Sequence, residues 1–283
     1  MKKIAVIGAG TMGNGIAHVF AQNGFEVNLI DTQSTTLDKA MQTIAKNLDR
    51  QVAKSIIQKA DKATTLAKIT CFTSLKDGVQ DRDLVIEAAT ENSKIKIAIF
   101  SEMDQYTHPT CILATNTSSI SITQLAEATQ KPANVIGMHF MNPVPVMKLV
   151  EIINGKATSS EVTDVIVSLT TTIGKIPCVV KDAPGFIANR ILMPMINEAI
   201  LAFEEGISDA ATIDQIMKLG MAHPMGPLQL ADYIGLDVCK NILEIMEEGF
   251  QNSKYKPAAL LTKMVEAGKL GIKTGEGFYT YQK

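Results

Sequence analysis

Gly8-Ala9-Gly10-Thr11-Met12-Gly13 lies between the apolar run Ile4-Ala5-Val6-Ile7 and a segment of helical period at 14–23. This G-x-G-x-x-G pattern, placed after a strand and before a helix, is typical of the first turn of a dinucleotide-binding sheet. Gly8 suits the tight turn, Gly10 lets the backbone approach a pyrophosphate, and Gly13 lets the helix pack closely on the strand. The free N–H groups at the helix N-terminus favour phosphate. We therefore expect residues 8–13 to bind a dinucleotide.

The next strand-like run ends at Asp31, about twenty residues beyond the glycines. A carboxylate at this point accepts hydrogen bonds from adenosine ribose hydroxyls and repels a 2′-phosphate. Thr32 and Gln33 follow it and offer no arginine to a 2′-phosphate, so the sequence favours NAD over NADP. FAD fits the same fingerprint, but a chain of this size with a helical second part fits a nicotinamide enzyme better. A tight turn with a surface acid is the structural alternative.

The first part of the chain alternates between strand and helix. Short runs rich in Val and Ile, typical of buried parallel strands, occur at 3–7, 26–30, 84–88, 111–115, 135–140, 147–153 and 177–180. A helical segment at 35–60 interrupts the alternation, with apolar residues at spacings of three and four. The pattern predicts an α/β fold: a Rossmann-type doubly wound sheet with a helical-hairpin insertion, followed by an all-α C-terminal domain.

We place the domain boundary near Asp182-Ala183-Pro184-Gly185, because Pro184 and Gly185 interrupt the chain and the later period is helical. The expected domains are an NAD-binding Rossmann domain at 1–183 and a helical substrate and dimerisation domain at 184–283. Within the second we expect helices at 186–205, at 227–248 and at 257–267, and one that Ser208 caps and that ends near Gly220.

Composition excludes several classes of function. The chain has 283 residues, 46% of them hydrophobic and 20% charged, and a net charge of −2, which gives no basic face for nucleic acid. No apolar run is long enough to cross a bilayer, and the N-terminus has no cleavable signal, so we expect no membrane association. The four cysteines are scattered without a Cys-x-x-Cys pair, which predicts a reduced, cytoplasmic protein without a structural metal.

A dehydrogenase needs a base for the hydroxyl proton, and histidine suits this role. Of four histidines, His139 lies near the carboxyl end of the run 135–140, where ligands bind in open α/β sheets. His18 follows the glycines in a helix, His108 lies in a loop, and His223 is a reserve candidate. A buried, hydrogen-bonded structural histidine is the alternative for His139.

Glu151 lies within the apolar run 147–153, where burying an acid is costly unless it is paired. If the two runs are neighbours, Glu151 can hold one imidazole nitrogen of His139 and stabilise the imidazolium; a surface acid on an edge strand is the alternative. Ser118 follows the run 111–115, and Asn189 lies on the first helix of the second domain. Either side chain could hydrogen-bond a substrate oxygen, or serve only a turn and a helix surface.

Together these stretches resemble the 3-hydroxyacyl-CoA dehydrogenase family, and within it the bacterial 3-hydroxybutyryl-CoA enzymes. The resemblance spans the whole chain in the family's order and rests on Gly8-Ala9-Gly10-Thr11-Met12-Gly13, Asn116-Thr117-Ser118-Ser119, Gly137-Met138-His139-Phe140-Met141-Asn142-Pro143, Pro184-Gly185-Phe186-Ile187-Ala188-Asn189-Arg190, His223-Pro224-Met225-Gly226-Pro227 and Lys273-Thr274-Gly275-Glu276-Gly277-Phe278-Tyr279.

The resemblance implies a role for each candidate. His139 is implied as catalytic base with Glu151 as its partner, and Ser118 and Asn189 as substrate hydrogen-bonders. Contacts to the nicotinamide half of NAD are implied for Glu91, Lys96, Ser118, Asn142 and Lys273. The family further implies a homodimer formed through the C-terminal domain, and short-chain (S)-3-hydroxyacyl-CoA thioesters as substrates in fatty-acid or butyrate metabolism; the sequence fixes neither the physiological direction nor the chain length.

A basic stripe on the helical insertion, at Lys39, Lys46, Arg50 and Lys54, gains meaning from the resemblance. Arg50 and Lys54 match positions that hold the phosphates of coenzyme A, and arginine favours a bidentate phosphate contact. The alternative is a solvated helix face. Two other hypotheses remain: a dehydrogenase of free hydroxy acids, such as the gulonate type, and a protein that binds or senses NAD without turnover.

Overall fold

The computed structural model describes residues 1–281, and the chain divides between Ala183 and Pro184 into two compact units. Within the described residues, the first unit contains an eight-stranded sheet in the order β3-β2-β1-β4-β5-β6-β7-β8. The strands are β1 (Lys3–Ile7), β2 (Glu26–Ile30), β3 (Ile69–Phe72), β4 (Leu84–Glu87), β5 (Ile112–Thr115), β6 (Val135–Phe140), β7 (Leu149–Asn154) and β8 (Ile176–Lys181).

Strands β1 to β6 run parallel, and β7 pairs antiparallel with β6, while β8 runs parallel to β7. The doubly wound α/β sheet is confirmed. The prediction missed β3, because this edge strand is short and exposes Thr70 and Cys71. The edge strand β8 is also largely exposed, unlike the buried strands expected from its apolar residues.

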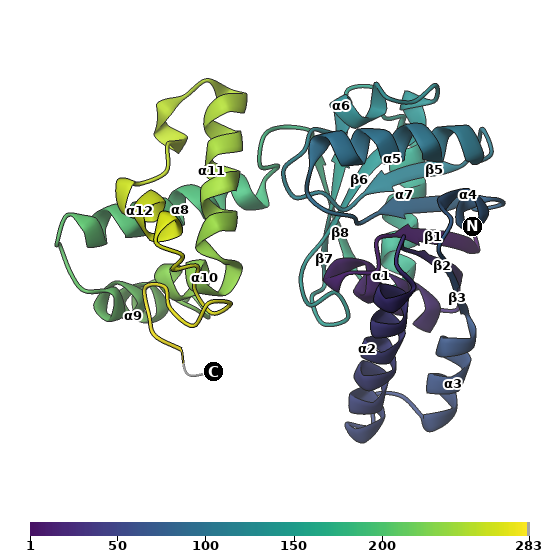
Figure 1. Cartoon of the computed structure of the whole chain (residues 1–283), viewed down its shortest axis with the longest axis horizontal. Coiled ribbons are helices and arrows are strands. Elements are labelled where there is room, and N and C mark those ends of the chain that lie inside the picture. The colour runs from purple at the N-terminus through teal and green to yellow at the C-terminus, as the bar shows by residue number, and fades with distance from the viewer. Residues whose placement is uncertain (282–283) are drawn as a thin grey trace. The chain divides into compact units, whose positions relative to one another are not determined.

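Helices cover both faces of the sheet (Figure 1). One face carries α1 (Thr11–Gln22) and α7 (Ser160–Thr172), whose apolar residues join the main core with β1, β6 and β7. The other carries α4 (Leu75–Val79), α5 (Ser93–Tyr106) and α6 (Ile122–Ala126). A short 3₁₀ helix, η1 (Pro132–Asn134), precedes β6.

The helical insertion is a hairpin of α2 (Ser34–Ala53) and α3 (Lys59–Ala67), which pack on each other and on α1 (Figure 1). Its apolar stripe buries Leu37, Ile44 and Leu48. The helical segment expected at 35–60 contains the turn of this hairpin, because Ser55 takes a positive φ of 55° just after the end of α2. Ile56 therefore lies in the turn and is 65% exposed.

The second unit is helical, with α8 (Ala188–Glu204), α9 (Ala210–Gly220), α10 (Pro227–Ile234), α11 (Leu236–Phe250), α12 (Ala259–Glu266) and the 3₁₀ helix η2 (Ser253–Tyr255). Two details differ from expectation. Asp209, not Ser208, caps α9 by accepting from Thr212 N. The helix expected at 227–248 is broken at Gly235. This residue has a φ of 106°, which glycine adopts readily because it has no Cβ.

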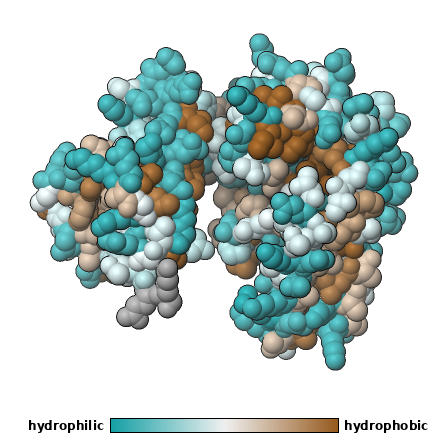
Figure 2. Space-filling view, in the orientation of Figure 1, coloured by the Kyte–Doolittle hydropathy of each residue, from teal (hydrophilic) through white to brown (hydrophobic). Residues whose placement is uncertain are grey.

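Among the helices of residues 1–281, none is both long enough and apolar enough to span a membrane. Hydrophilic side chains cover most of the visible face, with apolar patches on each unit (Figure 2).

Candidate active site

His139 and Glu151 face each other across the antiparallel pair β6/β7, where the register sets His139 directly opposite Glu151. Directly opposed residues point to the same face of a sheet with neighbouring Cβ atoms. The ring Nδ1 lies 2.8 Å from Glu151 Oε2, and both side chains are buried. A proton on Nδ1 that is donated to Glu151 leaves Nε2 as a proton acceptor. The pair thus has the geometry of an oriented base.

The other ring nitrogen faces Ser118, whose Oγ lies 3.1 Å from His139 Nε2. Ser118 belongs to the polar loop after β5, and this loop is tied to β6 because Asn116 Oδ1 accepts a hydrogen bond of 2.9 Å from Phe140 N. The carboxyl ends of β5 and β6 thus present a serine hydroxyl and an imidazole side by side.

Glu91 organises the same loop. Its Oε1 accepts from the hydroxyls of Thr117 at 2.6 Å and Ser119 at 3.0 Å, and from the backbone N–H groups of Ser118 at 2.8 Å and Ser119 at 3.1 Å. Burial raises the pKa of Glu91, but the Lys96 ammonium and these donors outweigh burial and leave the pKa below its usual value. Glu91 is therefore ionised at neutral pH.

The Lys96 side chain, close to this loop, is only 1% exposed. Its Nζ is 2.7 Å from Glu87 Oε1 and 3.4 Å from Glu91 Oε2, and it donates to Ala89 O at 3.2 Å. Glu87, the last residue of β4, was not among the residues predicted from the sequence. A signal was present, since an acid in an apolar run requires a partner, and Lys96 follows nine residues later.

The glycine turn has the shape that its sequence predicts. Gly8 has a φ of +93°, and a Cβ there would lie 2.6 Å from Ala88 O, while a Cβ on Gly13 would lie 1.7 Å from Gly8 O. Around Gly10, the N-cap of α1, a Cβ would meet nothing within 4 Å, and no side chain caps the helix. This open helix N-terminus fits a dinucleotide pyrophosphate. Asp31 Oδ2 accepts from Ala9 N at 2.9 Å and so ties the turn to the end of β2.

The loop after β6 is held by a lysine and by helix α1. It contains a cis bond between Asn142 and Pro143. The buried Lys175 donates from Nζ to Val144 O at 2.5 Å and to Met147 O at 2.6 Å. A Cβ on Gly15 would lie 2.9 Å from Val144 Cβ, so helix α1 packs directly on the loop.

The remaining candidates lie elsewhere in the chain. Arg50 and Lys54 are exposed at the end of α2, where Arg50 Nη1 is 3.3 Å from Asn47 Oδ1. Asn189 is buried in the first turn of α8 in the second unit, and Lys273 of that unit pairs with Asp237. His223 lies in the loop before α10, and His108 in the loop before β5. The structure thus brings Glu91, Ser118, His139 and Glu151 together within the first unit.

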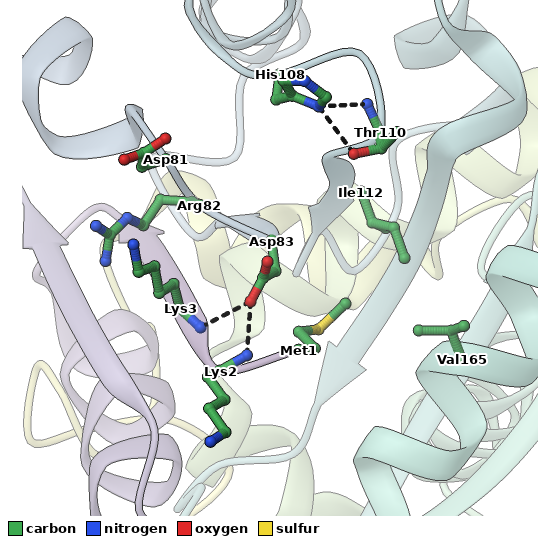
Figure 3. A pocket seen from close by; sticks show the side chains of 10 residues that line it. All are labelled: Met1, Lys2, Lys3, Asp81, Arg82, Asp83, His108, Thr110, Ile112 and Val165. Carbon is green, nitrogen blue, oxygen red and sulfur yellow. Dashed lines mark hydrogen bonds between the residues drawn. The ribbon is translucent and has the colours of Figure 1, made fainter.

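A different cavity, of about 720 Å³, lies at the amino ends of β1, β4 and β5, the opposite edge of the sheet from His139 (Figure 3). Its Asp83 accepts from Lys2 N at 2.6 Å and Lys3 N at 2.9 Å. No three His, Cys, Asp or Glu side chains among residues 1–281 are arranged to hold a metal ion.

Known proteins of one family match this chain along its whole length. Residues 3–183 match the NAD-binding domain of 3-hydroxyacyl-CoA dehydrogenase, and residues 185–281 match its C-terminal domain. A 3-hydroxybutyryl-CoA dehydrogenase of Bradyrhizobium diazoefficiens is 50% identical over 100% of this chain and 96% of its own length. One of Clostridioides difficile is 47% identical over 99% of this chain and 100% of its own. The crystal structure of an (S)-3-hydroxybutyryl-CoA dehydrogenase from Ralstonia eutropha has a TM-score of 0.97, at 47% identity and full coverage of both chains.

The fold and these matches define an NAD-dependent oxidoreductase with a Rossmann-type sheet. The chain belongs to the 3-hydroxyacyl-CoA dehydrogenase family, and the resemblance inferred from its motifs is confirmed. NAD is accordingly its cofactor, as the glycine turn and Asp31 predicted.

Proposed function

We propose that the enzyme interconverts (S)-3-hydroxybutyryl-CoA and acetoacetyl-CoA with NAD(H), using His139 as the base and Glu151 as its partner. The observation that carries the proposal is the His139–Glu151 pair, 2.8 Å apart on opposed strands, with Ser118 at the other ring nitrogen. Two relatives, 50% and 47% identical over nearly the whole chain, bear the name 3-hydroxybutyryl-CoA dehydrogenase, which supports the substrate.

In the oxidative direction, His139 Nε2 takes the proton of the substrate's 3-hydroxyl while the hydride leaves C3. NAD⁺, when bound, accepts that hydride. Glu151 holds Nδ1 and stabilises the imidazolium that forms. Ser118 donates to the same substrate oxygen and keeps it near Nε2. In the reductive direction, the imidazolium returns its proton to the carbonyl oxygen.

The other assignments are part of the same proposal. Gly8, Ala9, Gly10, Thr11, Met12, Gly13 and Asp31 hold the adenosine diphosphate half of NAD. Glu91, Asn142 and Lys273 serve the nicotinamide half with Ser118, and Lys96 acts there through Glu91. Asn189 hydrogen-bonds the substrate, and Arg50 and Lys54 hold the phosphates of coenzyme A. We place this homodimeric enzyme in the cytoplasm, in fatty-acid or butyrate metabolism.

The test follows NADH oxidation at 340 nm with acetoacetyl-CoA, for the wild type and for His139→Gln. We expect turnover by the wild type and a kcat at least roughly 100-fold lower for the variant, since general base catalysis is worth about that much. NADH affinity, measured by nicotinamide fluorescence, stays near that of the wild type. NADH binding without turnover by the wild type, or turnover retained in His139→Gln, contradicts the proposal.

A further inference from the structure

Glu87 is a fully buried carboxylate at the carboxyl end of β4. Its Oε1 accepts from Ala89 N at 2.6 Å and from Lys96 Nζ at 2.7 Å, and its Oε2 accepts from Thr115 Oγ1 at 2.7 Å. Burying an ion pair contributes little net stability, because desolvation offsets the attraction between the charges. Stability alone therefore does not account for a carboxylate and an ammonium at this position.

The ion pair is one end of a continuous series of contacts. Lys96 Nζ bridges two carboxylates, at 2.7 Å from Glu87 and 3.4 Å from Glu91. Glu87 therefore fixes the ammonium from the buried side, and the ammonium in turn attracts Glu91 from the loop side. Glu91 Oε1 then accepts the four hydrogen bonds that shape residues 117–119, including the one from Ser118 N.

A second route leads from Glu87 to the same loop. Thr115 donates its hydroxyl proton to Glu87 and accepts from Thr117 N at 3.1 Å through the same oxygen. Glu87 also fixes the turn after β4 by accepting from Ala89 N, and the neighbouring Ala88 packs against Gly8 of the glycine turn. One carboxylate thus holds the two loops that flank the carboxyl ends of β4 and β5.

We propose that Glu87 is a positioning residue for the dehydrogenase reaction: through Lys96, Glu91 and Thr115 it sets the loop that places Ser118 beside His139, and it sets the turn beside the nicotinamide half of NAD. The assignment rests on the proposed function for the roles of Ser118 and the nicotinamide contacts. Glu87 itself touches neither substrate nor cofactor.

The test compares Glu87→Gln and Glu87→Asp with the wild type in four measurements: kcat, KM for acetoacetyl-CoA, NADH dissociation constant and thermal midpoint. Glutamine keeps the shape and removes the charge that fixes Lys96. Aspartate keeps the charge but is too short to reach all three donors, and it leaves no unpaired buried charge, so it also serves if the glutamine variant fails to fold.

We expect kcat to fall roughly tenfold or more in Glu87→Gln and several-fold in Glu87→Asp, as small misplacements of a reacting group cost rate. The NADH dissociation constant rises several-fold in both, and KM for acetoacetyl-CoA stays within about twofold, because the proposed coenzyme A contacts, Arg50 and Lys54, are at the end of α2.

The matched control is Asp83→Asn, an acid-to-amide change just before the same strand, at its amino end (Figure 3). Asp83 holds Lys2 N and Lys3 N, so its loss lowers the thermal midpoint and leaves kcat and NADH affinity unchanged. Glu87 variants that lose stability but keep both kcat and NADH affinity overturn the inference. The NADH arm needs no acyl-CoA turnover, so it still decides the inference if the proposed reaction fails.

Discussion

Two histidines are buried in the sheet unit, and their surroundings differ. The His139 ring is held between Ser118 Oγ and Glu151 Oε2. His18 lies fully buried in α1, and within residues 1–281 neither of its ring nitrogens has a hydrogen-bond partner. Burial lowers the pKa of His18 to about 4; the nearby Gln22 side chain partly opposes this shift, and the charge of Lys175 adds a smaller lowering contribution. His18 is therefore a neutral packing residue at neutral pH.

The lowered pKa of His18 makes stability depend on pH. Its pKa falls from 6.5 to about 4 on folding, so between these values the unfolded chain binds the proton and the folded chain does not. The contribution of His18 to the free energy of unfolding is therefore fully present above pH 6.5, and it is lost progressively as the pH falls from 6.5 towards 4. We expect the free energy of unfolding in urea to fall by about 2 kcal/mol between pH 7 and pH 5 through this group.

His18→Met removes the group and so reduces that fall. His108→Met changes an exposed ring instead and keeps the full fall, because His18 is intact. An equal loss of stability in the wild type and His18→Met between pH 7 and pH 5 would assign the effect to other groups.

For single residues, the need of a polar side chain for a partner was predictable from the sequence, whereas the hydrogen bonds that it makes in the fold were less so. His139 and Glu151 stood out because a polar group in an apolar run needs a partner, and the structure brings them together. The same argument applied to Glu87 would have pointed to Lys96. The hydrogen bonds that Glu91 accepts were not predictable, because they depend on the path of a loop rather than on any spacing.

Among the elements, α2 carries the residues proposed to bind the phosphates of coenzyme A. Arg50 and Lys54 are exposed at its end, one helical turn apart. Replacing both with Ala should raise KM for acetoacetyl-CoA roughly tenfold, from the loss of exposed charge-assisted phosphate contacts, and leave kcat within about twofold.

An acetoacetyl thioester of pantetheine lacks the nucleotide of coenzyme A. It therefore tests whether the rise in KM comes from lost contacts to the nucleotide phosphates. Its KM should not respond to the double substitution. Lys39→Ala, at the other end of the same basic stripe, is the matched control and should leave KM for acetoacetyl-CoA unchanged. An unaltered KM for acetoacetyl-CoA in the double variant favours a dehydrogenase of free hydroxy acids.

In the second unit, one carboxylate joins two helices and the C-terminal segment. Asp214 of α9 is buried and accepts from Leu228 N at 2.8 Å and Gln229 N at 2.9 Å in the first turn of α10, and from Tyr279 Oη at 2.7 Å. Asp214→Ala leaves the N–H groups of Leu228 and Gln229 unpaired and leaves Tyr279 Oη only its bond to Ala210 O, so we expect a loss of about 2–4 kcal/mol of unfolding free energy in urea.

The control is Asp209→Ala, which removes the exposed cap of α9 and should cost clearly less. Equal losses for the two variants would show that Asp214 acts only as an ordinary cap. The helix pattern gave no sign of this arrangement, because Asp214 joins segments far apart in the sequence.

Element type was predictable from sequence, and element ends were less so. Apolar periodicity indicated the sheet and the helical hairpin, which local pattern largely decides. The ends of α2 and α10 depend on single backbone conformations, at Ser55 and Gly235, that the apolar pattern continues across. The apolar pattern also could not predict that β7 runs antiparallel to β6, because a strand buried on both faces has the same composition in either direction.

At the scale of the whole molecule, the second unit exposes apolar side chains that a single chain leaves in water. Leu219 is 78% exposed, Ile207 71%, Met221 61% and Ile216 56%. Two of them, Ile216 and Leu219, line a shallow depression of about 470 Å³ on α9 with Thr212 and Gln215. A concentration of exposed apolar side chains of this kind favours burial against another protein surface. It supports the proposed homodimer through the helical unit.

We therefore expect light scattering after gel filtration to give twice the mass of one chain for the wild type. Leu219→Glu places a charge in the proposed interface, where burying it unpaired is costly, so the variant should run as a monomer at micromolar concentration. Ile56→Glu, an equally abrupt change at a 65% exposed residue of the sheet unit, should remain dimeric. NADH binding should persist in the Leu219→Glu monomer, because the glycine turn and the Glu91 loop belong to the first unit. A Leu219→Glu variant that stays dimeric would move the interface away from α9.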